Sequence, residues 1–292
     1  MQSIGWHITF DLRGRLPVAR TAAEWDTATR TLGRVLAPWQ NAAHCLVHDH
    51  AHGLVAGDRE AAGRAAHAVE CAIGWWRRSK EAEQRTTWNP PRFKPIFDRK
   101  NLADATVYVL ENGGVATGTE ALRWRWSSAW EVLGLREPTY ALATGFEVTS
   151  VPFVAGILTG SASWRPPAAG KLVTPAEPIA TLTRVAAVAL GCPPAGDRMG
   201  TAKWRKVALA LAVQRGWSPR DVAPALGISE RSARRLAAEP GPNVALECAS
   251  RLLGLVIGGL PLPELPPDPL PWGSRVRKTF RPTPPSPARP SP

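Results

Sequence analysis

Two histidines separated by one residue, His50 and His52, form the pattern in the sequence with the clearest chemical use. On a β-strand, side chains two positions apart point to the same face, so both imidazoles can reach one metal ion. Two histidines leave the coordination shell incomplete. Farther along the chain, Tyr108 and Asn112 have the i, i+4 spacing that places them on one face of a helix. Asn112 can supply an amide oxygen to the metal, and Tyr108 can supply a phenolic nucleophile.

A tyrosine beside a metal is suited to cutting a phosphodiester. A phenol has a pKa of about 10 and is a weak nucleophile at neutral pH without assistance. A divalent ion polarises the phosphate and stabilises charge on its oxygens. Attack by the tyrosine leaves a covalent phosphotyrosine, which keeps the energy of the bond for rejoining. The chain has two tyrosines, and Tyr140 follows Pro138 in a segment typical of a linker, so Tyr108 is the better candidate.

Each of these features also has a simpler explanation. A lone His-x-His pair is a weak signal, and a single tyrosine in a helix usually serves packing. His44 and His48, near the pair, each fit an ordinary surface histidine. The choice of metal stays open as well, because Mg²⁺ prefers oxygen ligands and two imidazoles suit Mn²⁺ or Zn²⁺ at least as well.

Four short segments carry a more specific signal, because they occur in a fixed order. Residues 44–55 are HCLVHDHAHGLV, residues 92–96 are RFKPI, residues 107–112 are VYVLEN, and residues 126–130 are WSSAW. They resemble the segments YCLMPNHVHLLV, RFK-x-I, RYIHLNP and PWSSY of single-tyrosine HUH transposases, in particular the REP-associated tyrosine transposases. The resemblance covers roughly residues 5–135 of the chain.

The resemblance implies a role for each matched residue. It implies His50, His52 and Asn112 as metal ligands, Mg²⁺ or Mn²⁺ as the ion, and Tyr108 as the nucleophile. The implied substrate is single-stranded DNA or the hairpin ends of repeats. Departures from the family's segments are His44, His48, Asp49, Ala51 and Gly113. None of them removes a ligand or the nucleophile, although they are compatible with a diverged, host-domesticated copy of weak activity.

The elements that must position these residues alternate between strands and helices. Apolar spacing predicts strand 6–12, helix 22–36, strands 43–47 and 51–56, helix 59–80, strand 92–97 and helix 102–111. We expect the last of these helices to stop at Gly113 and Gly114. Strand, helix, strand, strand, helix, strand is the order of the ferredoxin-like, split βαβ fold. The sequence therefore predicts an α+β protein with a ferredoxin-like catalytic domain, followed by an all-α helix-turn-helix domain.

Residues 201–260 carry the predicted helix-turn-helix. A helix over residues 201–216 is followed by a short helix that Ser218 caps, then by a turn at Gly227 and a basic helix capped by Ser229. A generic basic helical hairpin is the simpler alternative. The residues expected to contact DNA are Lys203, Arg205, Arg231, Arg234 and Arg235.

The composition is compatible with a nucleic-acid partner. Lysine and arginine number 36 against 24 aspartates and glutamates, a net charge of +12. Such an excess favours a polyanion, because neutralising phosphates releases condensed counterions. The four cysteines lie far apart, so we expect reduced thiols in a cytoplasmic, nucleoid-associated protein. We expect no membrane association, because the sequence shows no signal-peptide order and no apolar stretch of spanning length.

Proline and glycine mark the remaining segments. Residues 138–200 are predicted to be a connector with a short helix over 178–190, and residues 261–292 a disordered, basic, proline-rich tail. The predicted division is thus 1–137, 138–200, 201–260 and 261–292.

Taken together, these features favour a metal-dependent DNA transposase or site-specific endonuclease that cuts and rejoins one strand through a 5′-phosphotyrosine. A non-catalytic, domesticated DNA-binding regulator is the alternative. An RNA-binding module is the third reading, and it is disfavoured because no aromatic run of the RNP type occurs. The sequence leaves open the DNA target, the metal used and the oligomeric state.

Overall fold

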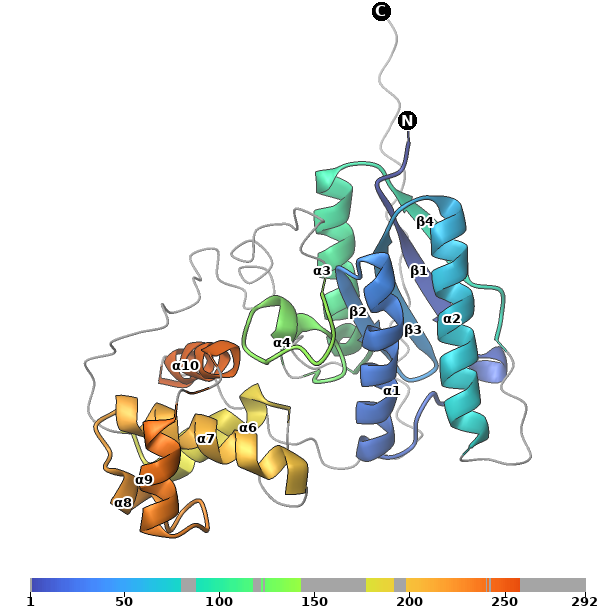
Figure 1. The fold of residues 1–292 in the computed structure, drawn as a ribbon. Coiled ribbons are helices and arrows are strands. Elements are labelled where there is room, and N and C mark those ends of the chain that lie inside the picture. The colour runs from blue at the N-terminus through green and yellow to red at the C-terminus, as the bar shows by residue number, and fades with distance from the viewer. Residues whose placement is uncertain are drawn as a thin grey trace, which may run out of the picture.

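The computed structural model describes residues 2–79, 88–117, 122, 124–142, 177–191, 198–239, 241 and 243–257. The predicted tail and most of the predicted connector lie outside these ranges. Within them the chain is a mixed α+β protein, in which an antiparallel sheet with its helices precedes a group of helices (Figure 1).

A four-stranded antiparallel sheet with the strand order β2-β3-β1-β4 forms the centre of the first part. Its strands are β1 (Gly5–Asp11), β2 (Ala43–Leu46), β3 (His50–Ala56) and β4 (Arg92–Ile96). Helix α1 (Ala22–Leu36) connects β1 to β2, and helix α2 (Arg59–Arg78) connects β3 to β4. The predicted order of strands and helices is therefore the observed order.

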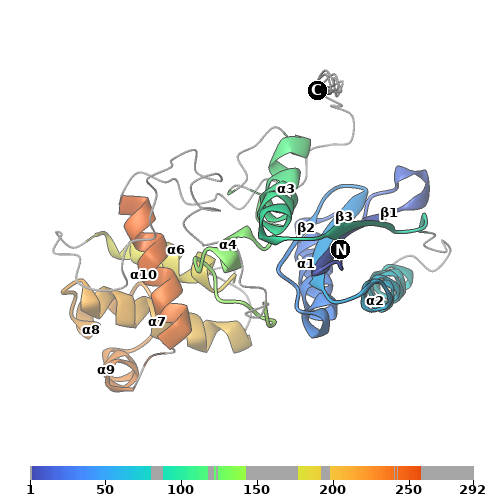
Figure 2. The same ribbon diagram turned by 90° about the horizontal axis from the view of Figure 1, so that it is seen from above.

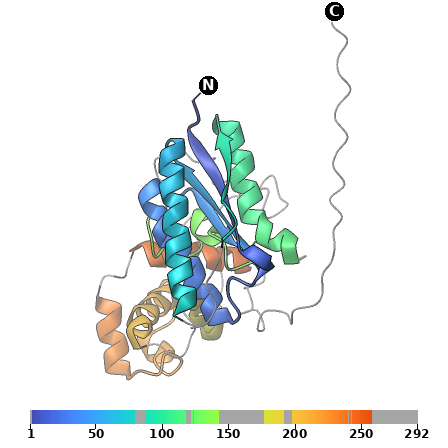
Figure 3. The ribbon, with the colours of Figure 1, turned by 90° about the vertical axis from the view of Figure 1, so that its right-hand side faces the viewer.

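The two faces of the sheet are covered by different helices. α1 and α2 lie side by side on one face, and α3 (Arg99–Thr117) lies on the other (Figures 2 and 3). Alternation along β1 sends Ile8 and Phe10 into the core under α1 and α2, where both are fully buried. The opposite positions, His7 and Thr9, face α3 together with His52. The face under α1 and α2 is thus apolar, whereas the face under α3 combines a buried apolar cluster with these polar groups.

Helix α3 runs through Gly113 and Gly114 to Thr117, so the predicted helix stop at these glycines is wrong. Gly113 is buried, and a Cβ placed on it would lie 1.9 Å from Cδ1 of Trp124. The Trp124 indole is itself anchored, because its Nε1 donates to the carbonyl oxygen of Leu46 at 2.8 Å. Gly113 is therefore a point of close packing between α3 and the sheet, and helical hydrogen bonding continues past it.

The helices of the second part form one apolar core. They are α6 (Ile179–Ala189), α7 (Arg198–Gln214), α8 (Pro219–Val222), α9 (Glu230–Ala238) and α10 (Asn243–Ile257). The short helix predicted in the connector is α6, which packs against α7 and α10 through buried residues such as Leu182 and Val185. The helical core thus begins at α6, ahead of the predicted start at residue 201. None of the helices described is long and apolar enough to cross a membrane.

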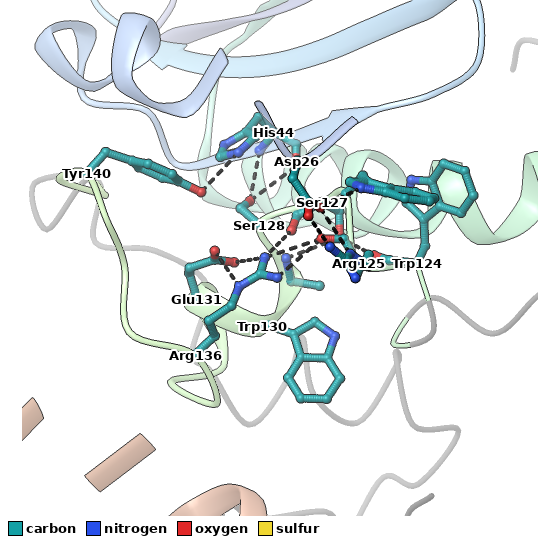
Figure 4. Close-up of polar contacts among 12 residues, drawn as sticks. Asp26, His44, Trp124, Arg125, Ser127, Ser128, Trp130, Glu131, Arg136 and Tyr140 are labelled. Atoms are coloured by element: carbon teal, nitrogen blue, oxygen red, sulfur yellow. Dashed lines mark hydrogen bonds and ion pairs between the residues drawn. The ribbon is translucent and has the colours of Figure 1, made fainter. Parts of the chain in front are cut away.

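The short helix α4 (Ala129–Val132) joins the two parts, because Trp130 belongs to an apolar cluster that reaches from the sheet to α10. A buried polar network fixes the segment around it (Figure 4). The guanidinium of Arg136 lies 2.7 Å from a carboxylate oxygen of Glu131 and donates to the carbonyl oxygen of Ser127 at 3.1 Å. Glu137 then pairs with Lys203 of α7 at 2.5 Å.

The same network buries His44, which the sequence left as a surface histidine. Its Nε2 bonds with the hydroxyl of Tyr140 at 3.1 Å, and its Nδ1 bonds with Asn41 at 2.9 Å. Burial raises the pKa of Tyr140 well above its ordinary value. Tyr140 is therefore a structural residue, which ties the segment after α4 to β2.

Replacing Gly113 by alanine should lower the free energy of unfolding by about 1–3 kcal/mol, because the new methyl group displaces Trp124 from its place against Leu46. Gly63→Ala in α2 is the matched control. A Cβ there meets only the flexible end of Arg59, at 3.4 Å, so the better helix propensity of alanine should stabilise by up to about 1 kcal/mol. Equilibrium urea unfolding measures both variants. Similar effects of the two substitutions would contradict the role given to Gly113.

Candidate active site

The two histidines of β3 lie on the same face of the sheet, as their spacing predicts. Their ring centroids are 4.8 Å apart. His52 is buried, whereas the side chain of His50 is 24% exposed. The carboxylate of Asp49 bonds with the His50 imidazole, and the distance between Oδ1 of Asp49 and Nδ1 of His50 is 2.8 Å. This bond leaves Nε2 of His50 as the nitrogen that can bind a further group.

Helix α3 brings Tyr108 and Asn112 to the same place. The Tyr108 ring meets the His52 ring edge-on, with centroids 5.6 Å apart, and remains 51% exposed to solvent. The Asn112 amide lies close enough to His52 to oppose the lowering of that residue's pKa. The structure thus brings together the four residues that the sequence singled out, from two elements far apart in the chain.

His7 and Thr9 of β1 also lie at this place, and the sequence motifs did not predict them. Nε2 of His7 lies 3.0 Å from Nδ1 of His52, and the hydroxyl of Thr9 lies 3.3 Å from the same nitrogen. The His7 ring also meets Tyr108, with centroids 5.5 Å apart. The available signal was a pair of polar residues at alternate positions of an otherwise apolar strand. Only the pairing of β1 with β3 shows that they lie beside His52.

Burial keeps the central histidines neutral. It lowers the pKa of His52 to about 2, and the adjacent His50 and His7 add to the effect. It lowers the pKa of His7 to about 4, with further lowering by Lys94 and then Arg92 of β4. Lys94 is exposed and opposite His7 in the sheet, whereas Arg92 forms an ion pair with Asp11 at 2.8 Å. Neutral imidazoles beside cations suit an anionic group such as a phosphate.

The residues present fit a divalent metal ion. Nε2 of His52 is buried and has no hydrogen-bond partner among the described residues, while its Nδ1 is engaged by β1. Nδ1 of His50 is likewise engaged, by Asp49, and an outer partner on the second ring nitrogen is usual for metal-binding histidines. The described residues contain no cluster of three or more histidine, cysteine, aspartate or glutamate side chains able to hold a metal. A third protein donor to a metal at His50 and His52 would have to be another kind of side chain, and the Asn112 amide lies beside His52.

The helical part contains the capped helices and the glycine turn on which the helix-turn-helix prediction is based. Ser218 caps α8 and Ser229 caps α9, each accepting a hydrogen bond from a backbone N–H three residues on. Gly227 between them has a φ of 61°, which favours glycine. Ala233 is buried and Leu236 packs against the same core, so α9 presents its other face to solvent.

The five basic residues proposed for DNA binding divide into two groups. Lys203 is paired with Glu137, and Arg205 donates to the carbonyl oxygen of Leu226 at 3.0 Å, so both have structural partners. Arg234 is paired with Glu230 along α9. Arg231 and Arg235 are exposed, and neither forms an ion pair within the described part of the chain.

Comparison with known proteins gives little further information. No protein-family model matches the chain, and no curated protein matches it. Among solved structures, the chain is similar to a REP-associated tyrosine transposase bound to a REP hairpin, with 18% sequence identity and a TM-score of 0.32. The match covers 48% of this chain and 87% of that one. A likeness this weak carries no argument about the chemistry of this chain.

The buried histidines should make stability depend on pH. Burial lowers the pKa values of His7, His44 and His52 from 6.5 to about 4, 3 and 2. Below about pH 6.5 the unfolded chain binds more protons than the folded one, so each histidine should remove up to about 1.4 kcal/mol of stability per pH unit. This stability is present above about pH 6.5 and is lost as the pH falls towards the folded pKa values.

Urea unfolding of wild type and His44→Gln, from about pH 7 to about pH 4.5, tests this dependence. The variant should lose less stability on acidification, because one buried histidine no longer titrates. His67→Gln on the exposed side of α2 is the control and should keep the wild-type slope. An unchanged slope in His44→Gln would contradict the prediction.

Proposed function

We propose that this chain is a metal-dependent tyrosine endonuclease that cuts one DNA strand and rejoins it, with Tyr108 as the nucleophile. The observation that carries the proposal is the meeting of a half-exposed tyrosine with His50, His52 and Asn112 on one side of the sheet. A tyrosine that only filled space would be expected to be buried, whereas the ring of Tyr108 is open to a substrate.

The fold supports the same proposal. The chain order β1-α1-β2-β3-α2-β4 and the antiparallel sheet β2-β3-β1-β4 are compatible with the ferredoxin-like, split βαβ fold. This is the fold implied by the resemblance of residues 44–55, 92–96, 107–112 and 126–130 to REP-associated tyrosine transposases. The proposed substrate is therefore single-stranded DNA or the hairpin end of a repeat.

In the proposed reaction, the phenolic oxygen of Tyr108 attacks the phosphorus of a phosphodiester. A bond from tyrosine to phosphorus forms, and the bond from phosphorus to the 3′-oxygen breaks. The phenolic proton is released as the departing 3′-oxygen takes up a proton, so the products are a 5′-phosphotyrosine and a free 3′-hydroxyl. The reverse attack by a 3′-hydroxyl rejoins DNA and frees Tyr108, with no outside energy source.

The residues around Tyr108 have distinct roles in this proposal. His50, His52 and Asn112 would hold Mg²⁺ or Mn²⁺, which when bound stabilises charge on the phosphate oxygens. Lys94 lies beside His7 on β4 and attracts the phosphate into the site. Asp49 orients His50, and His7 of β1 orients His52.

Tyr108→Phe should abolish a covalent protein–DNA adduct and leave DNA binding unchanged, because phenylalanine keeps the ring and lacks the attacking oxygen. The assay is denaturing gel electrophoresis after incubation with labelled hairpin DNA in Mn²⁺ or in EDTA. Tyr140→Phe, the same substitution at the partly buried tyrosine, is the matched control and should retain the adduct. EDTA should prevent the adduct in wild type. An adduct formed by Tyr108→Phe would exclude Tyr108 as the nucleophile.

A non-catalytic DNA-binding regulator is the second candidate, and the exposed face of α9 favours it. The capped helix, the glycine turn and the exposed Arg231 and Arg235 are typical of a helix-turn-helix that binds DNA. Specific DNA binding without an adduct, unaffected by EDTA or by Tyr108→Phe, would favour the regulator over the nuclease.

Arg231→Gln and Arg235→Gln should each weaken DNA binding and reduce the slope of log affinity against log salt by about 1. Fluorescence anisotropy at several salt concentrations measures both quantities. Arg64→Gln on α2 removes the same charge far from α9 in the chain and should leave both unchanged. A loss in Arg64→Gln equal to that in the α9 variants would show that only net charge matters.

A further inference from the structure

His7 contacts both His52, a proposed metal ligand, and Tyr108, the proposed nucleophile. Its Nε2 lies 3.0 Å from Nδ1 of His52, and its ring meets Tyr108 edge-on. The side chain is 8% exposed, and its backbone is fixed in β1 between β3 and β4. His7 therefore has little freedom to turn away from His52, and it lies between a proposed metal ligand and the proposed nucleophile.

The hydrogen bond between two neutral imidazoles has two arrangements. If Nδ1 of His52 carries the proton and donates to His7, then Nε2 of His52 has a free lone pair. If His7 donates instead, Nε2 of His52 carries a proton and has no lone pair for a metal. The position of one proton thus decides whether His52 can be a ligand.

The contacts of His52 favour the first arrangement. Two groups able to accept a hydrogen bond, Nε2 of His7 and the hydroxyl of Thr9, lie near Nδ1. Nε2 of His52, by contrast, is buried and makes no hydrogen bond among the described residues, although the Asn112 amide lies near the ring. A buried N–H without an acceptor costs about 1–3 kcal/mol, so the proton is better placed on Nδ1.

We propose that His7 is a positioning residue, which accepts a hydrogen bond from Nδ1–H of His52 and so keeps the Nε2 lone pair of His52 available to a metal ion. The inference rests on the proposed function for the identity of the ligands. It assigns His7 the role that Asp49 has for His50, so that each histidine of β3 is oriented by a partner on its other nitrogen.

The first test is the tautomer of His52 in the metal-free protein. Nitrogen-15 NMR of histidine-labelled wild type distinguishes a protonated Nδ1 from a protonated Nε2, with His52→Gln identifying the resonance. We expect protonation at Nδ1 in wild type and a mixture or the opposite form in His7→Phe, which keeps a ring and removes the acceptor. His7→Gln places an amide oxygen near the lost Nε2 and should restore the wild-type tautomer.

The second test is Mn²⁺ affinity, measured by electron paramagnetic resonance of the free ion. His7→Phe should bind Mn²⁺ about 10–100-fold more weakly, the range for loss of an outer partner, and His7→Gln should recover most of the affinity. Thr9→Val removes the longer contact and should cause a smaller loss. Circular dichroism of each variant identifies any that has failed to fold, and the wild-type tautomer tests the proposal without any variant.

The outcomes separate this inference from the proposed function. A wild-type His52 protonated at Nε2 would overturn the inference, and so would a folded His7→Phe with unchanged tautomer and Mn²⁺ affinity. Protonation at Nδ1 that depends on His7, together with no Mn²⁺ binding by wild type, would support the inference about His52 and count against the metal-dependent nuclease.

Discussion

The close approach of α3 to the sheet at Gly113 is the contact on which the site depends. The thiol of Cys45 on β2, whose pKa burial raises to about 12, lies against the backbone of Gly113 and the indole of Trp124. Cys45 is paired with His52 in the sheet, and Asn112 precedes Gly113 in the helix. The absence of a side chain at Gly113 therefore sets how near Asn112 and Tyr108 come to His52. A wider gap would leave the histidines and the tyrosine as separate groups.

The two faces of β1 carry side chains of different kinds. Ile8 and Phe10 of β1 secure the sheet against α1 and α2, whereas His7 and Thr9 of the same strand serve the polar face. Polar groups under a helix are expensive to bury unless they are hydrogen-bonded, and here the histidines bond to each other and remain neutral. The rigid apolar face holds the register of β1 and β3, and that register holds the imidazoles in place.

The cations of this chain differ in burial, and those that are enclosed have structural partners. Arg136 is enclosed by carbonyl groups and Glu131, and Arg205 holds the turn after α8. These cations stabilise the junction and the helical core, and they are not free to meet a phosphate. Arg231 and Arg235 on α9, and Lys94 beside the candidate site, are by contrast exposed to solvent.

The sequence by itself determined the local features of this protein. Alternation in residues 6–12 predicted the first strand to within one residue. Thr21 and Asp58 cap the first two long helices. The spacing of His50 with His52, and that of Tyr108 with Asn112, placed each pair on one face of its element. Such features depend on neighbours within about four positions, so they can be read without the fold. Only the tertiary structure decided that α3 continues through Gly113, that His7 reaches His52, and which arginines are already paired. These outcomes depend on strand register and on how helices pack on the sheet, and both are set by contacts between residues that are distant in the sequence.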